Sequence, residues 1–427
     1  MKIVYVTAGS GRWECDACLR DGDLARELKK QGHEVLFVPT YTPLIIEDAK
    51  EVASRRIFYG GINVYLRHRF SFMRHMPSLL LKIFDQPWIL RLASRMEDMT
   101  DAKSLAQLTI SVLQGEHGAQ RKELMDMIQW LQSQMQPDAF VLPNSMFAGF
   151  AEPARRQLNC PVLCLLSGED GFIDLFPEPE RSECMKILRE QSNKVDRFIV
   201  PNAYYRGYMA DYLQIPEARF DIVPQCVNPE YYKPAEKAPE PFTIAFRHAM
   251  CPNNGLHILL EAWRLLRQDE ELPPCRVRAS GHLSGSDKPW FEAQLRKVRE
   301  WGLADDFEYV GELVPEARGK FLAEANVLSV PVIYPEPIAM FVPEALISGI
   351  PAVLPRRGAL TEWIEETGGG ILVEPDNPEA LALGIREIML NPEKAKDMAE
   401  KGRQKVLADY TLEKMASSLV QAVQKAR

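Results

Sequence analysis

Residues 335–346 read PEPIAMFVPEAL and place two carboxylates, Glu336 and Glu344, eight positions apart. The apolar run over residues 327–333, just upstream, predicts a buried strand. Pro343 suits the first position of a helix, which puts Glu344 in a first turn where the helix dipole favours negative charge. Free backbone N–H groups at such a helix start also bind anions. The stretch therefore predicts a site for a ligand that carries both hydroxyl groups and phosphate.

The bulk composition bounds the class of protein. At 427 residues the chain is too long for one ordinary hydrophobic core, so two or more domains are expected. Its net charge of −8 argues against nucleic-acid binding. Eight cysteines in a chain of this size indicate reduced thiols and hence a cytoplasmic location. The chain has neither the start of a signal peptide nor a run of eighteen apolar residues, so no membrane span is predicted.

Strand and helix patterns alternate along the chain, which predicts an α/β fold with parallel sheets. Two such series occur, and a proline- and charge-rich segment between them reads as a linker. We expect an N-terminal Rossmann-like domain over residues 1–228, with a helical insertion at about 70–135. A linker over 229–241 and a C-terminal Rossmann-like domain over 242–405 follow, and a helical segment over 406–427 closes the chain.

The acidic stretch is part of a longer pattern, because Gly349 and Pro351 complete it and Gly358 and Glu362 extend it. This string resembles the E-x7-E element of retaining glycosyltransferases with the GT-B fold, in particular glycosyltransferase family 4. The resemblance implies two Rossmann-like domains that face each other across a cleft, with residues 406–427 crossing back to the first domain. It also implies transfer of a hexosyl group from a nucleotide-diphosphate sugar to a hydroxyl acceptor, without a metal or cofactor.

The resemblance assigns roles to the residues of the acidic stretch. Glu336 would hold hydroxyl groups of the donor sugar, assisted by the backbone N–H groups of Ile338, Ala339 and Met340. Glu344 would accept hydrogen bonds from the ribose hydroxyls of the nucleotide.

A second family motif, Gly-Arg-Leu followed by Lys-Gly, is only partly present. Arg247 matches the arginine, and the resemblance implies that it stabilises the diphosphate leaving group. The glycine is replaced by Phe246, and the lysine position holds Asn254. Either the diphosphate is stabilised more weakly, or another cation such as His248 substitutes. The donor-side candidates are Glu344, Ile338, Ala339, Met340, Gly311 and Asn254.

Two segments of the first domain are candidates for the acceptor side. Gly9 and Gly11 follow the first strand, and the third glycine of a dinucleotide fingerprint is replaced by Glu14. This loop either faces the ligand or is a plain strand-to-helix turn. Glu169 and Asp170 end a later strand, where many family members carry a histidine followed by an acid. They contact the acceptor or the transferred sugar, with Asp170 a catalytic candidate, or they cap a helix start.

Residues 55–95 are basic and aromatic in an acidic protein, with eight arginines and lysines against the single acid Asp85. They predict either peripheral contact with an anionic membrane or a lipid-linked acceptor, or a helical insertion with solvated cations. The thiols of Cys15 and Cys18 are expected to be packed rather than to bind zinc.

Two alternatives to a glycosyltransferase stay open at this point. One is another GT-B enzyme, such as a nucleotide-sugar epimerase; a phosphorylase would carry a pyridoxal phosphate lysine, and no such lysine is identified. The other is a non-catalytic GT-B protein that binds a partner, which the replacement of the usual lysine by Asn254 favours.

Overall fold

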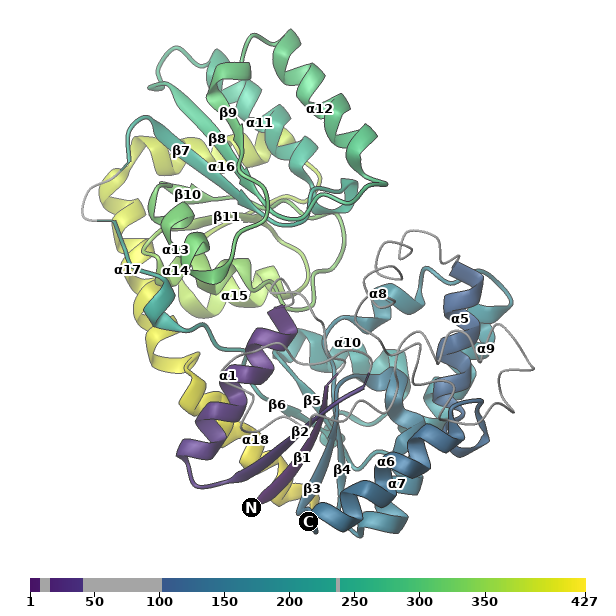
Figure 1. Ribbon diagram of the computed structural model, residues 1–427. Coiled ribbons are helices and arrows are strands. Elements are labelled where there is room, and N and C mark those ends of the chain that lie inside the picture. The colour runs from purple at the N-terminus through teal and green to yellow at the C-terminus, as the bar shows by residue number, and fades with distance from the viewer. Residues whose placement is uncertain (8–15, 41–101, 236–238) are drawn as a thin grey trace, which may run out of the picture. The chain divides into compact units, whose positions relative to one another are not determined.

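The computed structural model describes residues 1–7, 16–40, 102–235 and 239–427 (Figure 1). The chain divides into two compact units. The first comprises Met1–Pro224 together with Met415–Arg427, and the second comprises Gln225–Lys414.

The first unit is built on a six-stranded parallel sheet of order β2-β1-β3-β4-β5-β6. Its strands are β1 (Lys2–Thr7), β2 (Glu34–Pro39), β3 (Ala139–Leu142), β4 (Val162–Leu165), β5 (Arg197–Val200) and β6 (Phe220–Ile222). Every residue of β3 and β4 is buried. Such continuous apolar runs are typical of parallel strands that are covered on both faces.

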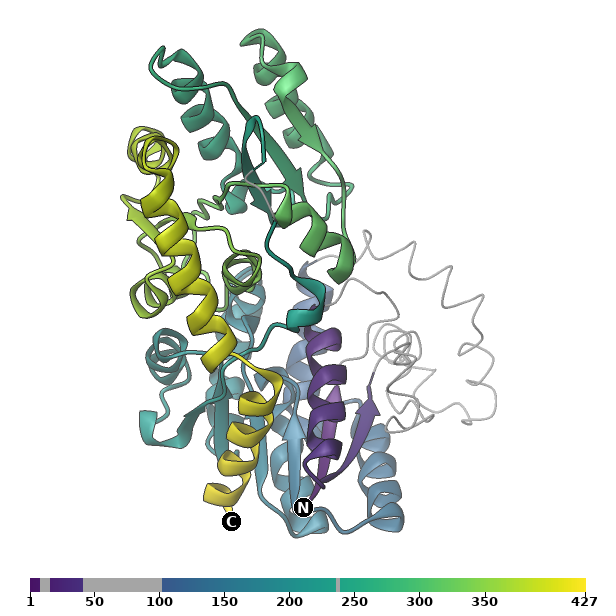
Figure 2. The same cartoon turned by 90° about the vertical axis from the view of Figure 1, so that its left-hand side faces the viewer.

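Helices cover this sheet on both faces, as right-handed crossovers require when the strand order reverses direction beside β1. The helices are α1 (Asp16–Lys30), α5 (Ala102–Leu113), α6 (Arg121–Gln134), α7 (Ala151–Leu158), α8 (Glu169–Ile173), α9 (Glu180–Ser192), α10 (Ala203–Leu213) and α18 (Leu412–Ala426). Shorter 3₁₀ turns are η4 (Gly115–His117), η5 (Ser145–Phe150) and η6 (Glu217–Arg219). Figures 1 and 2 show α1 and α18 side by side, and Lys425 of α18 pairs with Asp221 of β6 at 2.8 Å.

The second unit repeats the architecture with the sheet order β12-β11-β10-β7-β8-β9. Its strands are β7 (Phe242–Arg247), β8 (Cys275–Ser280), β9 (Phe307–Tyr309), β10 (Val327–Leu328), β11 (Ala352–Pro355) and β12 (Gly370–Val373). Its helices are α11 (Leu256–Gln268), α12 (Lys288–Glu300), α13 (Pro315–Ala323), α14 (Phe341–Ile347), α15 (Ala359–Thr367), α16 (Pro378–Leu390) and α17 (Pro392–Asp409). The 3₁₀ turns are η7 (Pro229–Tyr231), η8 (Pro252–Asn254) and η9 (Ala304–Asp306).

The predicted α/β class with two parallel sheets is confirmed. The boundary between the two units lies between Pro224 and Gln225, a few residues before the predicted end of the first domain at residue 228. The segment predicted as a linker begins with packed residues, since Tyr232 is 5% exposed. A Cβ on Gly319 would lie 1.7 Å from the carbonyl oxygen of Tyr231, so only glycine allows this approach of η7 to α13.

Two details of the predicted elements differ from the structure. Helix α14 begins at Phe341, so Pro343 is its third residue and not its first. Proline is still tolerated there, because N–H groups of the first turn have no partner within the helix. Within the predicted insertion, residues 102–134 carry α5, η4 and α6, and its part before residue 102 lies outside the described residues.

Candidate functional site

In the loop after β10, the buried Glu336 side chain lies against the backbone of the residues that follow it. Glu336 is only 8% exposed. Its Oε1 accepts hydrogen bonds from the N–H groups of Ala339 at 3.1 Å and Ile338 at 3.3 Å. Two of the N–H groups predicted to assist a donor are therefore directed at the Glu336 carboxylate in this structure.

Side-chain donors meet the second oxygen of Glu336. The Tyr334 hydroxyl donates to Oε2, and Nε2 of His248 lies 3.7 Å from the same oxygen. Burial alone would raise the pKa of Glu336, but His248, Tyr334 and the Ala339 amide outweigh burial and hold the pKa below its ordinary value. Glu336 is therefore ionised at neutral pH. Burial and the negative charge on Glu336 in turn raise the pKa of Tyr334, so its hydroxyl keeps its proton.

The start of α15 fixes the backbone of the Glu336 loop. Gly358 has φ 53° and ψ −144°, a region that is essentially restricted to glycine. A Cβ at this position would lie 2.7 Å from both the nitrogen and the carbonyl oxygen of Glu336. The next N–H, that of Ala359, donates to the Glu336 carbonyl at 2.8 Å. Packing against Glu336 explains why glycine extends the acidic pattern at position 358.

Asn254, the residue at the family's lysine position, contacts His248. Its Nδ2 lies 3.0 Å from Nδ1 of His248 and donates to the carbonyl of Ala249 at 2.8 Å. Asn254 is 3% exposed. The structure thus joins Asn254, His248, Tyr334 and Glu336 in one connected cluster within the second unit.

A second cluster surrounds Glu344, which is 4% exposed. Nε of Arg247 lies 3.0 Å from its Oε2, and Nη1 of Arg318 lies 3.4 Å from its Oε1. Burial and the charge on Glu344 raise the pKa of Tyr232 well above its ordinary value. Two guanidinium groups thus meet one carboxylate in this cluster. Guanidinium groups suit an anionic ligand.

The other two donor-side candidates lie in the same unit. Gly311 follows β9 with φ 80°, and its carbonyl accepts hydrogen bonds from the Ser280 hydroxyl at 3.0 Å and from the Gly281 N–H at 2.9 Å. The carbonyl of Ser280 accepts from the N–H of His248 at 3.0 Å, which connects Gly311 to the His248 strand end. Met340 directly precedes α14, and its carbonyl accepts from the N–H of Glu344 at 3.3 Å.

The two acids predicted for the acceptor side have different environments in the first unit. Glu169 is 6% exposed, and its oxygens accept hydrogen bonds from the N–H groups of Ser145 and Ser167, each at 2.8 Å. Burial raises its pKa, although these N–H groups oppose the shift. Asp170 is half-buried and accepts a hydrogen bond from the Tyr205 hydroxyl. The geometry of Glu169 is that of a loop cap, whereas Asp170 retains an exposed surface.

Several predicted features fall outside the described residues. These are Gly9, Gly11, Cys15 and the basic aromatic segment 55–95, and the description also excludes the side chain of Cys18.

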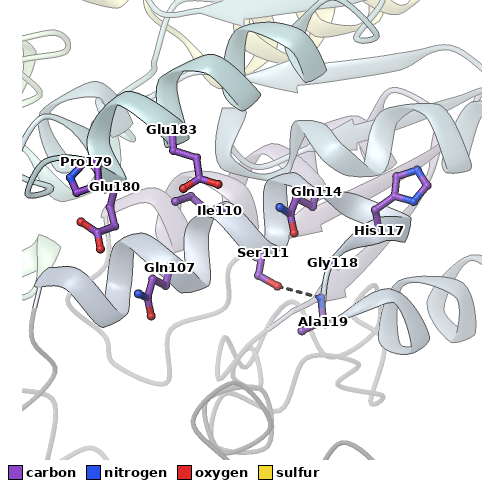
Figure 3. Close-up of a pocket in the computed structure, with 10 residues that line it drawn as sticks. All are labelled: Gln107, Ile110, Ser111, Gln114, His117, Gly118, Ala119, Pro179, Glu180 and Glu183. Atoms are coloured by element: carbon purple, nitrogen blue, oxygen red, sulfur yellow. Dashed lines mark hydrogen bonds between the residues drawn. The ribbon is translucent and has the colours of Figure 1, made fainter. Parts of the chain in front are cut away.

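The first unit also contains a surface hollow of about 560 Å³ between α5, η4 and α9 (Figure 3). Its lining consists of Gln107, Ile110, Ser111, Gln114, His117, Gly118, Ala119, Pro179, Glu180 and Glu183. The Ser111 hydroxyl oxygen accepts from the Ala119 N–H at 2.9 Å, and the hydroxyl donates to Gln120 at 2.8 Å. Lys103 pairs with Glu180 at 3.2 Å. The lining contains no predicted site residue.

Three residues of the clusters were not predicted as site residues from the sequence, namely Tyr232, Tyr334 and Arg318. Tyr334 stands two positions before Glu336, and this short spacing is the only signal that the sequence offers for it. Arg318 reaches Glu344 from α13, and no local pattern links these two positions. Among the helices that the structure describes, none is long and apolar enough to cross a bilayer.

Comparison with known proteins agrees with the fold. The sequence model of the family "Glycosyl transferases group 1" matches residues 228–405, the part of the chain that holds both clusters. Residues 228–405 are therefore similar to a glycosyl transferases group 1 domain.

One curated relative is D-inositol 3-phosphate glycosyltransferase of Segniliparus rotundus, 25% identical over 217 residues. That match covers 48% of this chain and 47% of the relative, so the chain spans about half the length of the relative it matches.

Solved structures extend the likeness to the whole chain. Sucrose-phosphate synthase of Thermosynechococcus elongatus has a TM-score of 0.72 at 16% identity and covers 100% of this chain and 98% of its own. HepE of Anabaena, in complex with UDP, has a TM-score of 0.71 at 13% identity and covers 100% of both chains. At these identities the likeness shows the fold, and the predicted GT-B fold class is confirmed.

Proposed function

We propose that this protein is a retaining glycosyltransferase that moves a hexosyl group from a nucleotide-diphosphate sugar to a hydroxyl acceptor. The observation that carries the proposal is that a buried, ionised Glu336 and a buried cluster of Arg247, Arg318 and Glu344 both lie in the segment that matches the glycosyl transferases group 1 model. A carboxylate suits sugar hydroxyls, and guanidinium groups suit a diphosphate.

Glu336 is proposed to accept hydrogen bonds from hydroxyl groups of the donor sugar. Its contacts with the N–H groups of Ile338 and Ala339 measure 3.3 and 3.1 Å, at the long end of the normal range. A sugar hydroxyl can therefore compete for Oε1 while Tyr334 retains Oε2. The N–H groups that are released, together with that of Met340, would then face the ligand.

Arg247 and Glu344 are proposed to bind the nucleotide part of the donor. The leaving diphosphate gains negative charge as the glycosidic bond breaks, so a fixed guanidinium group lowers the barrier. Ribose hydroxyls would replace one of the two guanidinium groups at the Glu344 carboxylate. That guanidinium group would then be able to bind the phosphates. Arg318, which pairs with the same carboxylate, supplies a second cation in the cluster. Gly311 and Asn254 complete the proposed donor side.

The proposed acceptor side lies in the first unit, with Asp170 as its catalytic candidate, and Gly9 and Gly11 are proposed to belong to it. The contacts of Glu169 favour the other reading of this acid, a loop cap. Retention fits reaction on one face of the sugar, in which the departing phosphate receives the proton of the incoming hydroxyl. No metal or cofactor is needed for that route, so incubation with EDTA should leave transfer unchanged.

The nucleotide can be identified by thermal shift with UDP, GDP, ADP and their glucose conjugates. UDP is the first choice because HepE was solved with UDP and with UDP-glucose. A ligand at 100 times its Kd adds about 2.7 kcal/mol to the free energy of unfolding, which raises Tm by several degrees. A protein that none of these nucleotides stabilises would overturn the donor assignment.

Substitution of Glu344 tests the nucleotide role directly. Glu344→Ala leaves two buried guanidinium groups without their carboxylate, so we expect a loss of about 3–5 kcal/mol in stability and weakened binding of the free nucleoside diphosphate. Glu365→Ala is the matched control, because its pair with Arg356 is exposed in the same unit. Nucleotide affinity that is equal in both variants would contradict the role of Glu344.

A lipid-linked acceptor and peripheral binding to the inner face of a cytoplasmic membrane are proposed for residues 55–95. Co-sedimentation with anionic vesicles, compared between the native chain and a variant with Arg67, Arg69 and Arg74 changed to serine, tests this contact. Equal sedimentation would argue that these cations are simply solvated.

A further inference from the structure

The contacts of His248 define which of its ring nitrogens carries a proton. The N–H of Ala249 donates to Nδ1 at 2.8 Å. A backbone N–H group can only donate a hydrogen bond. Nδ1 must therefore present a lone pair, and it carries no proton.

Asn254 supports the same conclusion independently. Its amide group lies against the carbonyl oxygen of Ala249 at 2.8 Å, and a carbonyl can only accept. The NH₂ end of Asn254 must therefore face this carbonyl, and the same nitrogen lies 3.0 Å from Nδ1 of His248. Two N–H donors converge on Nδ1, so a proton there would have to displace both.

The opposite ring nitrogen faces acceptors. Nε2 of His248 lies 3.4 Å from the Tyr334 hydroxyl oxygen and 3.7 Å from Oε2 of Glu336. The Tyr334 hydroxyl uses its single proton on Glu336, which leaves its oxygen free to accept. The side-chain hydrogen bonds then run from Asn254 to Nδ1 of His248, from Nε2 of His248 to the Tyr334 oxygen, and from Tyr334 to the Glu336 carboxylate.

We propose that His248 is held as a neutral imidazole with its proton on Nε2, and that it acts as a positioning residue that aims Tyr334 and Glu336 at the donor sugar. The inference rests on the proposed function and deepens it. His248 is then a neutral donor and does not replace the family's lysine. The positive charge for the diphosphate comes from the Glu344 cluster, through Arg247 and Arg318.

The tautomer can be read without any ligand. In the full-length protein labelled with ¹⁵N-histidine, the His248 signals are assigned by their loss in His248→Gln. We expect an unprotonated, acceptor-type Nδ1 and a proton on Nε2 at neutral pH. A proton on Nδ1, alone or together with Nε2, would overturn the proposal. Asn254→Asp is the companion variant, because its carboxylate cannot donate to Nδ1 and should shift the ring toward protonation there.

The positioning role is tested by slow donor hydrolysis, with whichever of UDP-, GDP- or ADP-glucose stabilises the protein most. His248→Gln keeps a neutral N–H donor near the position of Nε2, so its kcat should stay within about threefold of the native value. His248→Phe removes that donor and should lower kcat about tenfold with little change in KM. His248→Lys adds a cation and should resemble His248→Phe. Activity that is retained by lysine and lost with glutamine would show that a cation is needed instead.

The failures of the two proposals are distinguishable. Stabilisation by no nucleotide would remove the proposed function, while the ring tautomer would still be decided by the ¹⁵N spectrum. Tm measured for each variant separates misfolding from a specific effect. Native kcat in His248→Phe, with the expected tautomer present, would show that His248 is only part of the packing.

Discussion

Glu336 in the second unit and Glu169 in the first are similar in position and different in chemistry. Both follow a parallel strand, they are 8% and 6% exposed, and each accepts two backbone N–H groups. The pKa of Glu336 is lowered and that of Glu169 is raised. The difference lies in the side chains, because only Glu336 also meets Tyr334 and His248.

This contrast separates two uses of a buried carboxylate. The backbone N–H groups and the Ser145 side chain do not offset the desolvation of Glu169, so its proton is retained to higher pH. For Glu336 the pKa is lowered despite similar burial, and the groups that lower it are His248, Tyr334 and the Ala339 amide. A charged carboxylate that several donors hold in place is suited to a ligand, whereas a carboxylate that only joins two loops is suited to a structural role.

Exchanging each carboxylate for an amide should separate the two sites most clearly. Glu336→Gln removes the negative charge that is proposed to hold the sugar, so transfer should fall by at least about a hundredfold while nucleoside diphosphate binding survives. Glu169→Gln should leave transfer within a few-fold of native. Both are measured as transfer to water or to a supplied sugar alcohol, with affinity for the nucleotide measured by calorimetry.

The opposite ranking of these two variants would reverse the comparison. A large loss in Glu169→Gln with native Tm would place Glu169 in contact with substrate. If neither variant alters transfer, the site lies elsewhere in the molecule.

A substitution that leaves the chemistry of Glu336 intact but displaces its backbone should have the next largest effect. Gly358→Ala forces a Cβ to within 2.7 Å of Glu336 backbone atoms and strains φ, so a loss of about 3 kcal/mol is expected. Gly368→Ala is the control, because it also has positive φ, 61°, but no atom within 4 Å of its Cβ, and should lose about 1 kcal/mol. Chemical denaturation measures both, and equal losses would show that contact with Glu336 contributes nothing.

The sequence predicted the parts of this molecule that depend on local pattern. Alternating apolar runs were sufficient for the α/β class and the two sheets, because each parallel strand is buried on both faces. The pattern of Glu336, Glu344 and Gly358 could also be recognised, because these residues lie close together in the sequence. They stand in the loop after β10, in α14 and just before α15.

Contacts between distant segments could not be predicted in this way. Arg318 reaches Glu344 from another helix, and Nε2 of His248 approaches Glu336 from the end of the neighbouring strand β7. The different environments of Glu169 and Asp170 also depend on loop geometry, since adjacent residues at a helix start point in different directions. The sequence showed that Asn254 stands at the family's lysine position, but only the structure shows its contact with His248.

The smallest expected effect is the pH dependence of stability, which should have opposite sign for the two carboxylates. For Glu169 the folded protein binds a proton more tightly than the unfolded chain, so stability falls as pH rises from 4.5 through the raised pKa. For Glu336 the contribution is fully present above 4.5 and is lost as pH falls through the lowered pKa. The Tm of Glu169→Gln should therefore rise relative to that of native protein as pH increases above 4.5. On acidification below 4.5, the Tm of Glu336→Gln should fall less than that of native protein. Parallel Tm curves for native protein and both variants from pH 3.5 to 7 would show that the environments of the two carboxylates are equivalent.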